Sequence, residues 1–161
     1  MDTLVAPIPG APPLRRYAPP AVYRGATPAA GAEFTQKVDD GKCWRLLTLF
    51  VRLGTDANVA DRTLRVLYRD AEGNVLHVNG NPVTYPASTT AEDFSFSCWH
   101  PRGEWEVAAT NLVPLAPMLL WPGWDFHIDV VNIQATDTLT LIRFTAEKFY
   151  APGAADYDLA G

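Results

Sequence analysis

Short segments in which apolar and polar residues alternate recur along most of the chain, with turn residues between them. The segment CWRLLTLFVRL at 43–53 is almost continuously apolar and predicts a largely buried strand. TLRVLYR at 63–69 alternates, so Leu64, Val66 and Tyr68 are expected on one face of a second strand. Six further segments of this kind lie at 75–78, 93–99, 104–110, 116–121, 125–131 and 137–150. About eight short strands separated by turns, with no long amphipathic helix, predict an all-β fold: an antiparallel β-sandwich of jelly-roll type.

The beginning of the chain differs from this pattern. Seven of the 14 prolines lie within the first 28 residues, and proline fixes φ, lacks a donor and keeps the preceding residue extended. Residues 1–32 are therefore predicted to be neither a helix nor a central strand, but an extended Pro/Ala-rich arm that lies on a neighbouring copy or on its own domain, with a disordered linker as the less favoured alternative. The residues expected to make its contacts are Leu4, Val5, Ile8, Leu14, Arg15, Arg16, Tyr17, Val22 and Tyr23. The sandwich would then comprise residues 33–150, followed by a C-terminal tail at 151–161.

Charged residues crowd the segment 54–78 and raise the question of a catalytic site. Asp56 is expected in one turn, and Asp70 opens the next. Asp61 and Arg62 are expected to pin the entry to the following strand, by a local ion pair or by bonds to loop backbone groups. An exposed pair of this kind contributes only about 0–1 kcal/mol. Since nothing in the segment indicates a pocket, we interpret these residues as scaffold.

A second candidate is the alternation Asp125, His127, Asp129, which places all three side chains on one face of a strand. Such a set is able to hold a metal ion, as in some jelly-roll enzymes. The same alternation is also typical of a half-exposed antiparallel strand. Neither His77 nor His100 has ligand-like spacing to it. We therefore expect no metal and no cofactor, with a metal-dependent enzyme built on His127 as the less favoured alternative.

Tryptophans gather in the second half of the chain, at Trp99, Trp105, Trp121 and Trp124. Exposed rings on a β-sandwich are able to stack on sugars. They also close the ends of cores and dominate the centres of protein interfaces. The WPGW turn, with Trp121 and Trp124, is expected either to staple the sandwich or to touch a neighbouring subunit.

The overall composition narrows the function classes further. A net charge of −5 argues against non-specific nucleic-acid binding, and no apolar run is long enough to span a membrane. The N-terminus lacks the basic and apolar regions of a secretory signal. Cys43 and Cys98 are expected as two buried thiols in a reducing cytoplasm, with one disulfide as the alternative. The GxSxG, GxxxxGK[ST], HExxH and GxGxxG motifs are absent, so no enzymatic activity is expected.

Residues 43–149 resemble small virion proteins of tailed bacteriophages that are encoded among head genes. The shared pattern is an A-N-x-x-x-R turn, a D-x-x-G-x-V hairpin and a segment with Gly, Ile and Asp in that order before a long final strand. Here these positions are Ala57, Asn58 and Arg62; Asp70, Gly73 and Val75; and Gly123, Ile128 and Asp137. The resemblance implies no catalytic residues. It implies a non-enzymatic capsid decoration (cement) or minor capsid protein.

The resemblance also predicts the partners and the location of the chain. The partners would be the major capsid protein or other virion subunits, and a homo-oligomer is expected, with a trimer suggested by the three-fold positions of capsid lattices. The chain would be located in the virion, after assembly in the host cytoplasm. The alternative from another class is a host-surface or carbohydrate-binding module of a spike or tail fibre that uses the tryptophans.

Overall fold

The computed structural model describes residues 16–80, 83–88, 91–99, 105–107 and 110–152, with the backbone alone for 16–18 and 105–107. These residues form eleven strands and no helix. The strands are β1 (Arg16–Arg24), β2 (Phe34–Lys37), β3 (Lys42–Gly54), β4 (Thr63–Arg69), β5 (Val75–Gly80), β6 (Glu92–Ser97), β7 (Trp105–Val107), β8 (Thr110–Pro114), β9 (Leu119–Leu120), β10 (Asp125–Val131) and β11 (Thr138–Tyr150). Within the described part, therefore, no helix is long and apolar enough to cross a membrane.

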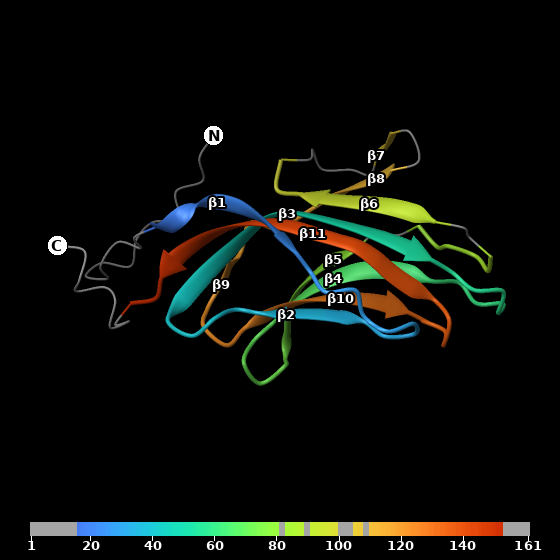
Figure 1. Cartoon of the computed structure of the whole chain (residues 1–161), viewed down its shortest axis with the longest axis horizontal. Coiled ribbons are helices and arrows are strands. Elements are labelled where there is room, and N and C mark those ends of the chain that lie inside the picture. Colours follow the sequence, from blue (N-terminus) through green and yellow to red (C-terminus); the bar gives the residue numbers. More distant parts are fainter. Residues whose placement is uncertain (1–15, 81–82, 89–90, 100–104, 108–109, 153–161) are drawn as a thin grey trace.

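Two sheets pack face to face in the strand order of a jelly roll (Figure 1). The larger sheet contains β1-β11-β3-β6 and the smaller sheet β2-β10-β4-β5. The pairs β1·β11, β2·β10, β3·β6 and β4·β5 are those of one long antiparallel hairpin that has been rolled up. Beyond β6, a parallel pairing adds β8 and then β7, while β9 pairs with β3. The predicted antiparallel β-sandwich of jelly-roll type is confirmed.

The segment expected to be an extended arm contributes the first strand of the roll. β1 pairs with β11 from Arg16↔Phe149 to Arg24↔Arg143, with two register shifts on the way. Its prolines are tolerated because it lies at the edge of the sheet, where the missing N–H group interrupts no central ladder. Of the two surfaces considered for the arm, residues 16–24 thus lie on their own domain. Residues 1–15, like the tail from residue 153, lie outside the described residues.

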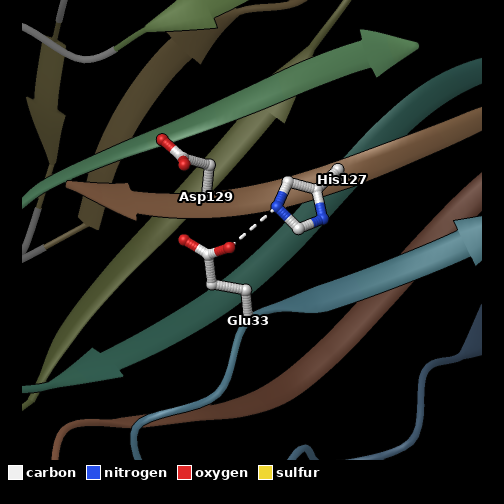
Figure 2. A group of neighbouring side chains, drawn as sticks. All are labelled: Glu33, His127 and Asp129. Atoms are coloured by element: carbon white, nitrogen blue, oxygen red, sulfur yellow. Dashed lines mark hydrogen bonds and ion pairs between the residues drawn. The ribbon is translucent and has the colours of Figure 1, made fainter. Parts of the chain in front are cut away.

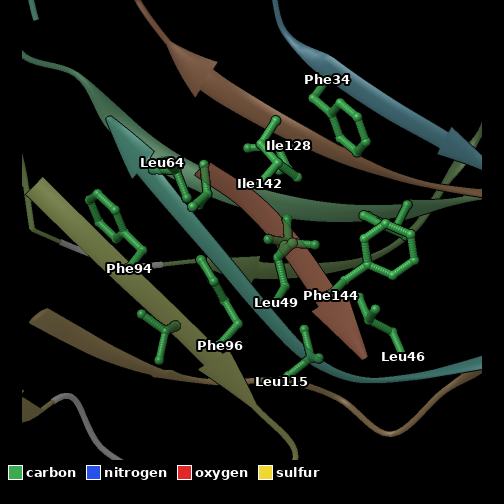
Figure 3. Packing of buried hydrophobic residues seen from close by; sticks show 14 of the residues in the cluster. Phe34, Leu46, Leu49, Leu64, Phe94, Phe96, Leu115, Ile128, Ile142 and Phe144 are labelled. Carbon is green, nitrogen blue, oxygen red and sulfur yellow. The ribbon is translucent and has the colours of Figure 1, made fainter. Parts of the chain in front are cut away.

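The core lies between the sheets and is built by alternation. On β4, Leu64, Val66 and Tyr68 are buried as expected, and Phe126 on β10 also points inward. Phe126 meets Phe144 of the larger sheet edge-on, with ring centroids 5.0 Å apart. Figure 3 shows how leucine, isoleucine and phenylalanine side chains from both sheets fill this space. Burial of these side chains is the main term that holds the sheets together.

The cysteines do not pair. Cys43 is buried in β3 and Cys98 is half-buried after β6, and both are free thiols. Burial raises the pKa of the Cys43 thiol to about 11. A thiol that stays protonated at neutral pH is a poor nucleophile.

Candidate functional site

The charged residues around Arg62 form a buried cluster. The guanidinium donates to both carboxylate oxygens of Asp137, at 3.0 and 3.1 Å. Its remaining nitrogen donates to the carbonyls of Asn58 and Ala60, at 2.7 and 2.6 Å, and Asp56 accepts a further bond. The side chains of Arg62 and Asp137 are both 0% exposed. The cluster therefore joins the loop before β4 to the turn between β10 and β11.

This geometry corrects one expectation and supports another. The local ion pair between Asp61 and Arg62 is wrong, because the arginine side chain extends inward and the Asp61 side chain stays at the surface. The bonds from Arg62 to loop carbonyls are present, as the second alternative supposed. All five donor positions of the guanidinium are directed at acceptors inside the fold, so this cluster is scaffold, not a site that faces a ligand.

Cross-strand ion pairs cover the outer face of the smaller sheet. Asp125 lies opposite Arg69 and Asp129 opposite Arg65 in the β10–β4 ladder. Arg69 Nε donates to Asp125 at 2.8 Å, and Arg65 Nε donates to Asp129 at 2.6 Å. His127 lies between the two aspartates on the same face, as the alternation predicted. The polar face of β10 is thus a row of matched charges.

His127 is held from both sides. Its Nε2 lies 2.9 Å from a Glu33 carboxylate oxygen, and its Nδ1 lies 2.8 Å from the Thr35 hydroxyl. A neutral imidazole with the proton on Nε2 satisfies both contacts, since Nε2–H donates to Glu33 and the Thr35 hydroxyl donates to Nδ1. The other Glu33 oxygen accepts the Val130 N–H at 3.1 Å, where β2 no longer pairs with β10. Figure 2 shows the Glu33 carboxylate directed at the imidazole, with Asp129 beside it.

The ligand atoms of Glu33, His127 and Asp129 lie within 4.8 Å of one another, close enough for one cation to reach all three. The chain's own groups already use them, however. Arg65 neutralises Asp129, and a metal would have to displace that guanidinium and the contact between Glu33 and His127. Both imidazole nitrogens are also engaged, so neither is directed at a substrate as a general base. The arrangement fits a structural network better than a metal centre.

A different kind of surface lies on β5, the outermost strand of the smaller sheet. Within the described part, β5 pairs with β4 alone, so it forms an edge of the smaller sheet. Its apolar side chains are exposed as well: Val75 by 51%, Leu76 by 44% and Val78 by 47%. Val78 also borders Leu67, a buried apolar residue on the outer face of β4. An apolar strip therefore continues from the sheet face to its open edge.

The other edges that can be compared are protected. β1 carries Pro19 and Pro20 and has two register shifts. β2 has only four residues and ends at Lys37. β5, with the sequence VLHVNG, contains no proline and no Asp, Glu, Lys or Arg. Proteins normally guard an edge with such residues, and an unguarded apolar edge marks a place where another chain adds.

The sequence pattern predicted a strand at 75–78 but did not identify it as an edge strand. The absence of proline and of Asp, Glu, Lys and Arg from this strand is visible in the sequence. That β5 is outermost is not visible there, since it follows from the order of the strands in the sheet.

The predicted aromatic contacts separate into exposed and packed rings. Trp121 is exposed, whereas Trp124 packs against the core. A turn joins them, with the Trp124 N–H bonded to the Trp121 carbonyl at 3.0 Å and Gly123 at a φ of 82°. Trp99 is also exposed. Trp105 belongs to β7, of which only the backbone is described.

Most of the predicted arm contacts lie outside the described residues: Leu4, Val5, Ile8, Leu14 and Arg15. Arg16 and Tyr17 belong to β1. Val22 points outward and is exposed. Tyr23 points inward and stacks on Trp44 and Phe144, with centroids 6.0 and 5.2 Å away. Val22 therefore remains accessible to a partner, whereas Tyr23 anchors β1 to its own core.

Comparison with known proteins gives little beyond this. No protein-family model matches the chain, and no curated protein matches it. Among solved structures it is similar to a chain of the "Structure of infectious bursal disease virus Gx strain", with a TM-score of 0.31 and 9% sequence identity. The similarity covers 89% of this chain and 43% of that chain, so this chain spans less than half of its length.

Proposed function

We propose that this chain is a structural subunit of a virion: a capsid decoration (cement) or minor capsid protein that stabilises a phage head through contacts with neighbouring subunits. Its partners are the major capsid protein or other virion subunits, and the chain forms a homo-oligomer, with a trimer as the expected form. It has no enzymatic activity and needs no cofactor. The observation that carries the proposal is the unguarded apolar edge of β5.

The physical reason is that the isolated chain leaves apolar side chains of this edge exposed to water. Three apolar side chains on a six-residue strand remain about half exposed. Full burial of a Val or Leu side chain contributes about 1.5–3 kcal/mol, so covering the exposed halves contributes roughly 1 kcal/mol each. A strand that pairs with β5 also satisfies its outer N–H and C=O groups. The edge thus favours a protein partner over a small molecule.

One further point supports a virion over other assemblies. The turn and hairpin motifs of residues 43–149 resemble small phage head proteins, and this resemblance stays a prediction. Jelly rolls are used by viral capsid proteins, but also by lectins and cupins, so the fold alone does not decide between them. The open edge favours assembly.

The test is incorporation into particles during infection by the virus that carries the gene. Tagged wild-type chain, Val78→Lys and Val59→Lys are supplied in trans, and the chain per purified particle is measured by quantitative mass spectrometry. Val59 lies in a loop and is 97% exposed, so its substitution is a matched control. We expect wild type and Val59→Lys in a fixed ratio to the major capsid protein, and at least about tenfold less Val78→Lys, since about 1.4 kcal/mol changes an affinity tenfold.

Two results would count against the proposal. Absence of the wild-type chain from purified particles refutes the virion role. Equal incorporation of Val78→Lys and Val59→Lys refutes the role of β5. Circular dichroism of both variants checks that they are folded.

The second candidate is a carbohydrate-binding module, which the exposed rings of Trp99 and Trp121 favour. A sugar that stacks on either ring changes its fluorescence. Titration with a broad glycan panel tests this candidate, with Trp99→Ala and Trp121→Ala as variants. Unchanged fluorescence across the panel removes it.

A further inference from the structure

Two arginines face each other on the outer surface of the larger sheet. Arg24 on β1 and Arg143 on β11 are direct partners in the antiparallel ladder. Their neighbours Tyr23 and Phe144 point into the core, so both arginines point outward, and both are exposed. Like charges directly opposite each other on paired strands are destabilising.

The other arginines with a described side chain are arranged differently. Every other arginine whose side chain is described is bonded to a carboxylate: Arg45 to Glu147, Arg52 to Asp93, Arg62 to Asp137, Arg65 to Asp129 and Arg69 to Asp125. Four of these five pairs are direct partners in a β-ladder. Within the described part, Arg24 and Arg143 are the two arginines without a carboxylate. The position where an acid is expected is occupied by a second base.

Both arginines line a shallow depression of about 180 Å³. Its lining residues are Arg24, Gly25, Thr27, Leu141, Ile142 and Arg143. A water molecule occupies about 30 Å³ in the liquid, so the depression has room for a carboxylate with several waters.

The backbone is unusual at the same place. β11 has an irregular register between Thr140 and Arg143, and Leu141 takes a φ of 52°. Positive φ is costly for a leucine and tends to be found where a backbone shape is needed. Gly25 is required by packing, because a Cβ there would lie 2.7 Å from Ile142 and from the Phe34 ring. The depression thus lies beside an irregular part of β11, contains the tightly packed Gly25, and is lined by two arginines that have no carboxylate partner among the described residues.

We propose that this depression binds the carboxylate of an acidic segment of a partner protein. A carboxylate placed between the two guanidinium groups accepts charge-assisted hydrogen bonds from both and relieves their repulsion. It would complete the Arg–carboxylate pattern that the chain uses elsewhere on its sheets. The inference goes beyond the proposed function and does not depend on it, because the site is tested on the isolated chain.

The experiment uses the full chain and a hexaglutamate peptide blocked at both ends as the probe. NMR spectra of the arginine Nε–H groups are followed during titration at constant ionic strength, for wild type, Arg24→Gln, Arg143→Gln and Lys37→Gln. Lys37 is an exposed cation on β2, so its substitution removes the same charge from a different surface. We expect saturable shifts of the Arg24 and Arg143 signals, at least fivefold weaker binding in either arginine variant, and unchanged binding in Lys37→Gln.

A parallel titration with inorganic phosphate distinguishes a small anion from an acidic segment. The proposal is overturned if hexaglutamate gives no saturable shift, if Lys37→Gln weakens binding as much as Arg143→Gln, or if phosphate binds more tightly than the peptide. Thermal unfolding in low salt adds an independent readout. Arg143→Gln is expected to melt higher than wild type because it removes the repulsion, and a lower melting temperature would show that Arg143 has a partner within the fold.

Discussion

Replacement of Arg62 by methionine tests how much the buried cluster that joins the loop before β4 to the turn between β10 and β11 stabilises the fold. Methionine is similar in length to arginine but carries no charge and no donors. The substitution therefore leaves the Asp137 carboxylate, 0% exposed, without its counterion. Asp137 keeps only the backbone N–H groups of Asp56 and Gln134, at 2.7 and 2.8 Å. The carbonyls of Asn58 and Ala60 lose their donor as well.

The expected cost follows from this burial. Breaking a buried ion pair by removing one partner destabilises by about 3–5 kcal/mol, whereas an exposed pair contributes about 0–1 kcal/mol. For a chain of this length, 1 kcal/mol corresponds to roughly 2–4 °C in melting temperature. Arg62→Met should therefore lower the melting temperature by about 6–20 °C. Arg65→Met, which removes a partly exposed pair with Asp129, should lower it by no more than about 4 °C.

The assays are thermal melting and urea unfolding, followed by tryptophan fluorescence and circular dichroism, of wild type, both single variants and Arg62→Met combined with Asp137→Asn. The double variant removes the orphaned charge and should recover part of the loss, as a coupling energy of about 0.5–3 kcal/mol. If Arg62→Met costs no more than Arg65→Met, the cluster does not act as a buried pair, and the reasoning is wrong.

Two further predictions concern the arm and pH. Deletion of residues 1–32 should lower the melting temperature more than deletion of 1–15 does, because only the longer deletion removes β1 and the stacked ring of Tyr23. Equal melting of the two truncated chains by circular dichroism would contradict the place of β1 in the fold. The hydrogen bond from Arg52 lowers the pKa of Asp93 despite partial desolvation. This pair therefore contributes its full stabilisation above the pKa of an unfolded aspartate, about 3.9, and the stabilisation is lost as the pH falls through the lower pKa of the folded state. The loss of unfolding free energy between about pH 6 and pH 3 should accordingly be smaller in Arg52→Gln than in wild type, and an equal loss in urea titrations would refute the pairing.

The alternation of apolar residues was sufficient to predict most of the strands, because a half-buried strand requires it. It predicted the buried face of β4 and the shared face of Asp125, His127 and Asp129. It did not predict β1, since a strand at an edge tolerates Pro19 and Pro20, which a central strand excludes. An edge strand need not show the pattern that identifies a central one.

The sites were less predictable, because they depend on partners distant in sequence. The bonds from Arg62 to loop carbonyls were one of two expectations, but its ion pair with Asp137, 75 residues away, was not expected. The like-charged pair of Arg24 and Arg143 exists only through the β1–β11 register. Composition identifies the charged residues, but only the topology decides which of them meet.

The two proposed contact surfaces lie at opposite edges of the sandwich. Gly25, directly after β1, packs against the ring of Phe34 at the start of β2, so β1 lies over β2. β5 lies at the other end, where Asn79 accepts the backbone N–H of Ala116 at 2.7 Å. The first surface is basic and the second is neutral and apolar, so the two surfaces do not complement each other. Under both proposals, one subunit contacts two chemically different neighbours at once, which is the geometry that a protein needs in order to bridge subunits of a shell.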